Sequence, residues 1–254
     1  MTGTNMTGAG RYKLIRLLDQ AEGYAAYSAL DIEQSTRPQV LINVYSGHDA
    51  IRSMVERYYG MSSALCRDYC RTFTEDGAFM TVFSLHDGEE FEASFPKRGG
   101  PDEKMRAEYA ETLLHAALEN SGMPPELLTE MLQMRNVVVQ EKNRRVMLNA
   151  GLRPVSRDPQ PASCALSPLL ERILGRRWSA CDEQIAFMDA AQEGRLNTVS
   201  ALYSAWRELV PIMQRDWEKT AFLSKVWRAI KRWWRSFVKK RRQRRKERRA
   251  ALEE

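Results

Sequence analysis

Short runs in which apolar and polar residues alternate fill the first third of the chain, a pattern typical of β-strands. The runs lie at Tyr12–Leu18, Tyr24–Leu30, Gln39–Tyr45, Cys70–Thr74 and Ala78–Phe83. An Asp-Gly pair joins the last two runs and favours a tight hairpin. Between the third and fourth runs, the apolar residues of 49–60 fall on one side of an expected helix. The pattern therefore predicts a small antiparallel sheet of five strands with one helix packed on it.

After a linker at Lys97–Asp102, the spacing of apolar residues becomes helical. Helices are expected at residues 103–120, around Leu127–Leu132, and at about 166–175, 182–192 and 195–220. A short hairpin is expected within Asn136–Asn149, followed by a proline-rich irregular connection at 153–166. The patterns divide the chain into a sheet-containing lobe (11–95), a helical lobe (103–220) and a C-terminal segment (221–254). The expected fold class is α+β.

The composition, 43% hydrophobic and 28% charged over 254 residues, is ordinary for a soluble globular protein and excludes collagen, disordered and multi-pass membrane proteins. The four cysteines form no Cys-x-x-Cys pair, and no histidine stands at zinc-finger distance from one. We therefore expect free thiols, no metal site and no cofactor. No uncharged apolar run reaches 18 residues, and the N-terminus lacks a signal peptide or myristoylation signal, so we expect a cytoplasmic protein.

The net charge of +6 hides a strong asymmetry along the chain. Residues 225–254 carry 14 of the 39 Lys and Arg but only three of the 33 Asp and Glu, a net charge of +11. The preceding 224 residues hold 25 basic and 30 acidic residues, a net charge of −5. A fold does not require such asymmetry, so it indicates an anionic partner for the C-terminal segment.

The order and spacing of the N-terminal elements resemble those of bacterial serine/threonine protein kinases. Arg11–Leu18, Gly23–Asp31 and Val40–Val44 are similar to the first strand, the strand after the glycine-rich loop and the Val-Ala-Ile-Lys strand of that family. Asp87–Phe91 looks like the segment just past the hinge, and Asn136–Leu148 like the hairpin between the catalytic and metal-binding loops. The resemblance implies a kinase-like two-lobed fold with a small antiparallel N-lobe sheet and a reduced, mostly helical C-lobe.

No kinase motif is intact at the positions that the resemblance assigns to nucleotide binding. Asp19, Ala21 and Tyr24 stand where glycines would let a loop approach phosphates, and Asp19 would repel those phosphates. Asn43 replaces the lysine that pairs with the phosphates. Glu56, on the helix that would carry the ion-pair glutamate, is then left without an ionic partner in that role.

The positions that the resemblance assigns to the base and the metal are also replaced. Met131 falls at the catalytic aspartate, and a thioether cannot act as a general base. Asn149 and Ala150 stand where the metal-binding Asp-Phe-Gly begins, and Asn136 alone matches a second metal ligand. The resemblance therefore implies a degenerate kinase, or pseudokinase, to which a nucleotide does not bind. A divergent kinase or nucleotidyl-transferring enzyme, and nucleotide binding without catalysis, are the alternatives.

From Phe222 onward the sequence predicts an amphipathic helix with an aromatic face and a cationic face. The residues expected to contact an anionic surface are Trp227, Lys231, Arg232, Trp233, Trp234, Arg235, Phe237, Lys239, Lys240, Arg241 and Arg242. One interpretation is a helix lying in the headgroup region of an anionic membrane. The others are a last core helix with a solvated basic extension, and non-specific nucleic-acid binding by Lys239–Arg249.

Other titratable residues carry no separate prediction of chemistry. The acidic cluster at Asp87–Glu92 and the single His115 on an expected helix are interpreted as solvated or packed residues. We therefore expect a noncatalytic binding or scaffold module that presents a surface to a protein partner. Its last helix would hold it at the inner face of the membrane.

Overall fold

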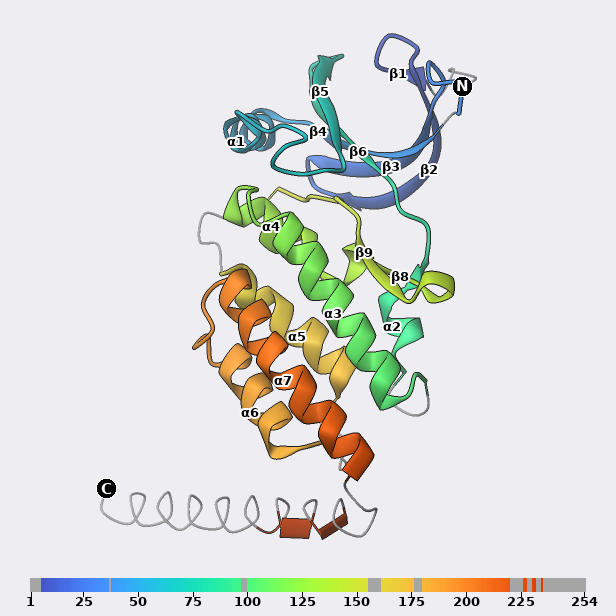
Figure 1. Cartoon of the computed structure of the whole chain (residues 1–254). Helices are drawn as coiled ribbons and strands as arrows, with labels where there is room; N and C mark the ends of the chain where they lie inside the picture. Colours follow the sequence, from blue (N-terminus) through green and yellow to red (C-terminus); the bar gives the residue numbers. More distant parts are fainter. Residues whose placement is uncertain are drawn as a thin grey trace, which may run out of the picture.

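A curled antiparallel sheet occupies the upper part of the computed structural model in Figure 1. In the described residues its six strands follow the order β1-β2-β3-β4-β6-β5. They are β1 (Met6–Thr7), β2 (Tyr12–Ala21), β3 (Tyr24–Asp31), β4 (Gln39–Tyr45), β5 (Tyr69–Glu75) and β6 (Ala78–Ser84). Helix α1 (His48–Tyr58) packs on the sheet through the buried side chains of Met54 and Tyr58. We call residues 6–84 the N-lobe.

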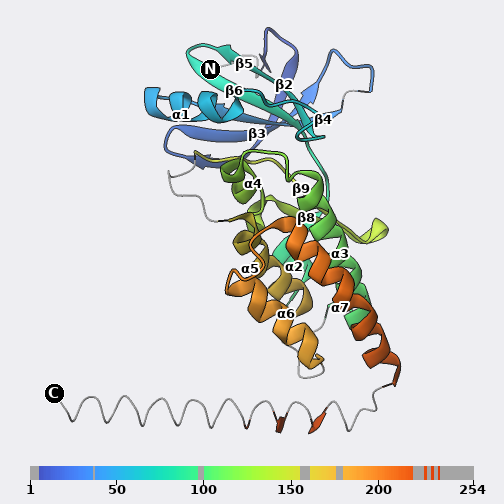
Figure 2. The same cartoon turned by 60° about the vertical axis from the view of Figure 1, so that its left-hand side comes forward.

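A mostly helical C-lobe lies below the sheet in both views of the ribbon (Figures 1 and 2). Its helices are α2 (Phe91–Ser94), α3 (Glu103–Glu119), α4 (Pro125–Met131), α5 (Ala162–Leu174), α6 (Asp182–Gln192) and α7 (Val199–Lys219). A small sheet of β7 (Glu89–Glu90), β8 (Val137–Gln140) and β9 (Arg145–Leu148) lies beside α3. The structure describes residues 6–36, 38–96, 100–154, 161–175 and 180–219, and five positions beyond: Val226, Trp227, Ile230, Lys231 and Trp234.

Both faces of the N-lobe sheet carry apolar residues, because each face packs into a different hydrophobic cluster. One face packs on α1 and the C-lobe, and its aromatic residues Tyr24, Tyr45 and Phe79 belong to the main core. The other face forms a separate cluster around Tyr12 and Ile42. The turn after β1 closes this second cluster, since Gly8, at φ +67°, lies against the Tyr12 ring. The Glu75 carboxylate at the end of β5 accepts hydrogen bonds from the Gly8 and Ala9 N–H groups at 2.8 and 3.0 Å, which ties the two sheet edges together.

The C-lobe core is held by helix-to-helix packing and by a few polar contacts. Helix α3 begins where the Asp102 carboxylate accepts the Met105 N–H at 2.8 Å, which satisfies one of the unpaired donors of its first turn. Trp206 of α7 is fully buried, and its indole N–H donates to Glu111 of α3. A buried aromatic with a satisfied N–H anchors α7 to α3, and this fixes where the C-terminal segment leaves the lobe.

The strands and helices predicted within residues 11–220 are present, with additions, and the helix predicted from Phe222 onward lies mostly outside the described residues. Five short elements were not predicted: β1, β7, α2 and the 3₁₀ helices η1 (Met134–Asn136) and η2 (Glu141–Asn143). Strand β1 is two residues long, and β7 consists of two exposed glutamates, so neither carries an alternating apolar pattern. Helix α5 begins at Ala162, inside the connection that the prolines had indicated to be irregular. Helix α7 begins at Val199, four residues later than expected, because Thr198 caps it by accepting the Ala201 N–H.

Within the described ranges, no helix is both long and apolar enough to cross a membrane. The four cysteines are free, and no group of three or more His, Cys, Asp or Glu side chains in the same ranges is arranged to hold a metal ion.

Candidate functional site

The carboxamide of Asn43 lies at the centre of the contact between the two lobes. Strand register places Asn43 between Ala26 on β3 and Thr81 on β6, on the face that meets the C-lobe. Its side chain is completely buried. The amide oxygen accepts from the Tyr24 hydroxyl at 2.8 Å and from the Leu152 N–H at 3.0 Å. The amide nitrogen donates to the Thr81 hydroxyl at 3.1 Å and the Ala150 carbonyl at 2.8 Å, so its two donors and two acceptor sites are all used.

Three phenol and hydroxyl groups extend this network through the N-lobe. Thr81 donates to the Tyr58 hydroxyl at 3.3 Å, and the Tyr45 hydroxyl donates to the Leu152 carbonyl at 2.6 Å. Burial raises the pKa of Tyr24, Tyr45 and Tyr58 far above its ordinary value. The three phenols therefore stay neutral and keep their protons for hydrogen bonding at every physiological pH.

The network ends on residues 149–153, which pass between the sheet and α4 (Figures 1 and 2). From the C-lobe side, the Asn136 carboxamide donates to the Gly151 carbonyl at 2.9 Å and to the Glu130 carbonyl at 2.8 Å. A Cβ atom on Gly151 would lie only 2.6 Å from the Asn136 side-chain oxygen, so only glycine fits there. Both lobes thus hold this one segment by hydrogen bonds to its backbone.

The Asn149 side chain forms hydrogen bonds with the backbone of His86, in the segment that joins the lobes. Its amide oxygen accepts the His86 N–H at 2.8 Å, and its amide nitrogen donates to the His86 carbonyl at 3.1 Å. A planar carboxamide presents a donor and an acceptor side by side, as the edge of a purine base does. His86 is itself held, since its ring nitrogen lies 2.8 Å from the Asp68 carboxylate. At this residue the connecting segment therefore has no unused backbone donor to offer a ligand.

An ion pair ties the end of β2 to the same segment. Arg153 donates to both carboxylate oxygens of Asp19, at 2.7 and 2.5 Å, across 134 residues of sequence. The hydrogen bond from Arg153 lowers the pKa of Asp19 below its ordinary value, so the carboxylate is charged at neutral pH. Asp19 therefore does not face a phosphate site as a free anion, since its charge is matched by an arginine.

A second acid and base complete this ionic cluster. Arg135 pairs with Glu130 and lies 3.7 Å from the nearer oxygen of Asp19, while the Arg153 N–H donates to Glu130 at 3.3 Å. Burial raises the pKa of Glu130, and the two arginines act against that shift. The cluster contains two carboxylates and two guanidinium groups, so it is neutral as a unit. It offers no excess positive charge that would attract a triphosphate.

Glu56, which the resemblance leaves without an ionic partner in the kinase role, lies away from Asn43. This carboxylate is 70% exposed and pairs with Arg52 at 3.5 Å on the outer face of α1, so it does not point toward Asn43. The face of α1 that meets the sheet carries Met54 and Tyr58 instead. Because successive helix residues are rotated by about 100°, Glu56 stands far around the helix from Met54. No glutamate of α1 is thus placed to meet a cation at position 43.

The remaining predicted positions are distributed between the core and the surface. Met131 is buried in the C-lobe core, and Ala150 is buried between the lobes. Ala21 is exposed at the end of β2, where it pairs with Tyr24 across the tight connection to β3. Asn136 and Asn149 come close together, since the Asn149 N–H donates to the Asn136 carbonyl at 2.7 Å. Their side chains bind backbone groups, and neither supplies the carboxylate that magnesium prefers.

Sequence reasoning missed Arg153, Arg135, Tyr45 and His86. Arg153 and Arg135 carry no motif, and their partner Asp19 is more than 100 residues away in sequence. The signal for these contacts in the sequence was Asp19 itself, the one acidic residue of a strand that also carries Lys13 and Arg16. Tyr45 binds the Leu152 backbone carbonyl, and His86 contributes its own backbone N–H and carbonyl to Asn149, so backbone atoms take part in both contacts and leave no trace in a side-chain pattern.

The predicted contact residues of the C-terminal segment are described only in part. Trp227, Ile230 and Trp234 are 68%, 49% and 59% exposed, and their spacing of three and four places them on one side of a helix. Lys231 is also exposed. The predicted contacts at Arg232, Trp233, Arg235, Phe237 and Lys239–Arg242 lie outside the described residues.

Comparison with known proteins establishes the fold. No protein-family model matches the sequence, and no curated protein matches it. Among solved structures, the Mycobacterium tuberculosis PknI kinase domain aligns with a TM-score of 0.57 at 12% identity, over 85% of this chain and 99% of that one. Rad53 in complex with AMP-PNP aligns at 0.55 and 13% identity, over 80% and 67% of the two chains. The apo pseudokinase GRMZM2G135359 aligns at 0.55 and 10% identity, over 78% and 91%. The chain therefore has a protein-kinase-like two-lobed α+β fold.

Replacing Asn43 is expected to destabilise the protein strongly. Asn43→Leu would leave the Tyr24 hydroxyl, the Leu152 N–H and the Ala150 carbonyl without partners, at about 1–3 kcal/mol for each buried group. Asn43→Lys would bury an ammonium group that can donate but cannot accept from Tyr24 and Leu152. Urea denaturation should show both variants to be less stable by roughly 3 kcal/mol or more. The exposed Asn197→Leu is the control. An Asn43→Lys protein as stable as the wild type would contradict this account.

The Asp19–Arg153 pair is expected to couple the lobes in a pH-dependent way. A double-mutant cycle with Asp19→Asn and Arg153→Met should give about 0.5–1 kcal/mol at pH 7, since the two side chains are 21% and 39% exposed. The folded pKa of Asp19 lies below the ordinary value of 3.8, so the stabilisation is complete above that value and is lost as the pH falls below it. The exposed Glu22→Gln in the neighbouring turn is the control. A coupling energy that stays constant down to pH 3 would refute the assignment.

Proposed function

We propose that this chain is a noncatalytic protein-kinase-like module, or pseudokinase, that acts by binding a protein partner. The observation that carries the proposal is the closed network around Asn43 between the two lobes. Every hydrogen-bonding site of the Asn43 carboxamide is used, and Asn149 takes both backbone groups of His86. A nucleotide would have to break these bonds and then find its own partners there.

The chemistry of phosphoryl transfer argues in the same direction. The reaction needs a cation on the phosphates, a group that orients the attacking hydroxyl, and carboxylates that hold magnesium. Asn43 is neutral and fully buried, and Met131 is part of the core. The cations nearest the end of β2, Arg153 and Arg135, are already matched by Asp19 and Glu130. Binding without catalysis is the function that these contacts support best.

The alternative is a divergent enzyme that binds ATP and transfers phosphate or AMP with unusual residues. Rad53, which shares the fold, was solved with AMP-PNP. The two hypotheses differ in one measurable property, the affinity for a nucleotide with its metal. Absence of measurable nucleotide binding supports the binding module, and saturable nucleotide binding supports the enzyme.

We further propose that the C-terminal segment holds the module at an anionic membrane surface, as a peripheral protein on the cytoplasmic face. Exposed tryptophans on one side of a helix, within a segment of net charge +11, are the features of a helix that lies in the headgroup region. Each basic residue near an anionic surface adds roughly 1 kcal/mol, reduced by salt. Nucleic-acid binding by the same cations is the competing function, and it would not need the tryptophans.

Thermal-shift titration with ATP and Mg²⁺ or Mn²⁺ should produce no saturable rise in Tm. A ligand at 100 times its Kd stabilises a protein by about 2.7 kcal/mol, so binding in the micromolar range would be visible at millimolar ATP. An active kinase domain run in parallel is the positive control. Labelled ATP should also transfer neither phosphate nor AMP to the protein or to a lysate. A saturable shift, or incorporated label, would overturn the noncatalytic assignment.

Removing the exposed apolar side chains of the C-terminal segment should abolish membrane binding and spare nucleic-acid binding. Trp227→Ser/Ile230→Ser/Trp234→Ser is expected to reduce sedimentation with phosphatidylserine vesicles at least about tenfold, because apolar burial at the interface is lost. Filter binding of DNA at the same salt should be unchanged. Ile15→Ser/Leu17→Ser/Ile32→Ser removes three exposed apolar residues of the N-lobe and is the matched control. Unchanged sedimentation of the tail variant would exclude membrane docking through these residues.

A further inference from the structure

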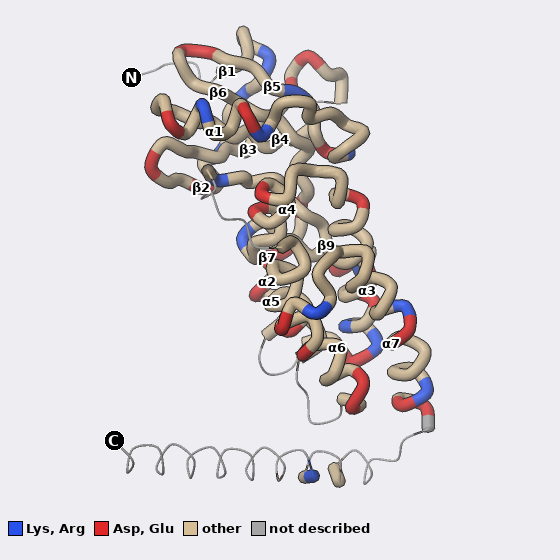
Figure 3. The backbone as a smooth tube through the Cα atoms, turned by 90° about the vertical axis from the view of Figure 1, so that its left-hand side faces the viewer, with Lys and Arg blue, Asp and Glu red and all other residues tan. Residues whose placement is uncertain are grey.

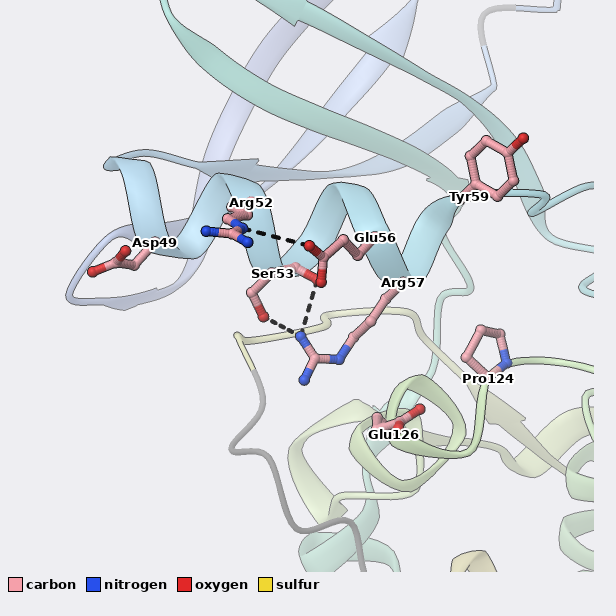
Figure 4. A pocket seen from close by; sticks show the side chains of 8 residues that line it. All are labelled: Asp49, Arg52, Ser53, Glu56, Arg57, Tyr59, Pro124 and Glu126. Atoms are coloured by element: carbon pink, nitrogen blue, oxygen red, sulfur yellow. Dashed lines mark hydrogen bonds and ion pairs between the residues drawn. The ribbon is translucent and has the colours of Figure 1, made fainter.

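An open groove of about 620 Å³ lies between α1 of the N-lobe and the start of α4 of the C-lobe (Figure 4). Asp49 stands at one end of the groove and Tyr59 at the other, and Glu126 lies on the opposite wall. The groove is separate from the network around Asn43, which none of its lining residues joins. Figure 3, in which the backbone is coloured by residue type, shows both signs of charge along α1.

The charges in the groove are unequally matched. Its two arginines have partners within α1: Arg52 pairs with Glu56 at 3.5 Å, and Arg57 donates to the Ser53 carbonyl at 3.0 Å and to the Ser53 hydroxyl (Figure 4). Two carboxylates remain, Asp49 and Glu126, and neither pairs with a cation among the described residues. Because Ser53 is neutral, its hydrogen bonds do not cancel the charge of Arg57, and the lining as a whole carries three carboxylates and two guanidinium groups, a net charge of −1.

Tyr59 adds an aromatic surface to these carboxylates. It is 91% exposed, a high value for a large ring, and Val55 on the same helix is 44% exposed. An exposed tyrosine ring can accept a stacked cation or an apolar side chain of a partner. Tyrosine is also common among the residues that dominate the energy of protein interfaces.

We propose that this groove binds a short segment of a partner protein that carries a single arginine or lysine among uncharged residues. The cation would pair with Glu126 or Asp49, and a neighbouring part of the segment would contact Tyr59. Arg52 and Arg57 would repel a neighbouring cation, so a run of basic residues such as Lys239–Arg242 is disfavoured. This rests on the proposed binding role and names a partner chemistry for it.

The walls of the groove come from different lobes, so a bound segment would bridge them. Asp49 and Tyr59 belong to the N-lobe side and Glu126 to the C-lobe side. Binding would therefore add to the contacts of the 149–153 segment in holding the lobes together. Hydrogen exchange in α1 and α4 should slow together when the groove is filled.

The test is selection of a randomised dodecapeptide display library on the full-length protein. Counter-selection uses the triple variant Asp49→Asn/Tyr59→Ala/Glu126→Gln, which removes both charges and the ring and retains the two arginines. Enriched peptides should carry one Arg or Lys between uncharged residues. Fluorescence anisotropy with a selected peptide should show binding about fivefold weaker or worse to Tyr59→Ala and to Glu126→Gln. Binding to Glu208→Gln, an exposed acid on α7, should be unchanged.

Several results would overturn the proposal. These are no enrichment over the triple variant, enrichment of acidic peptides, and an exchange footprint away from α1 and α4. Tighter binding of a peptide with the sequence of residues 239–250 would assign the groove to the chain's own C-terminal segment. Circular dichroism of each variant checks folding. The ATP titration is an independent experiment. If peptide binding to the groove fails, the noncatalytic assignment still stands. If ATP binds, the peptide-binding result can still be interpreted.

Discussion

The structure depends on one buried polar contact, the carboxamide of Asn43. It takes two hydrogen bonds and gives two, and through them β3, β6 and the 149–153 segment meet at one point. Only a side chain with both donors and acceptors can do this in a buried contact, because an unmatched polar group there costs about 1–3 kcal/mol. The same neutral carboxamide that joins the lobes therefore supplies no positive charge at this position.

Around Asn43, the polar and charged groups that could bind a ligand already form hydrogen bonds or ion pairs within the protein. The Asn149 carboxamide satisfies the His86 backbone, and Arg153 and Arg135 are neutralised by Asp19 and Glu130. Such satisfied networks rigidify the parts that they join.

Two other surfaces expose groups that the proposals above use. The groove between α1 and α4 has carboxylates and an exposed tyrosine, and the C-terminal segment has exposed tryptophans in a strongly basic context. The groove lies at the boundary between the lobes, and the segment follows α7, which Trp206 anchors to α3. In these proposals the groove would bind a protein partner and the segment would set location.

The order of the strands and helices could be predicted from the sequence, because alternation and helical spacing are local properties. The sequence also predicted that Tyr24 fills space that phosphates would need; its side chain is buried, with its hydroxyl bound to Asn43. The pairing of Glu56 with Arg52 was not predicted, although Met54 and Tyr58 already marked the opposite, buried face of α1. The partners of Asp19 and Asn149 were decided only by the tertiary structure. Arg153 is 134 residues from Asp19, and His86 contributes backbone atoms, so no local pattern records either contact.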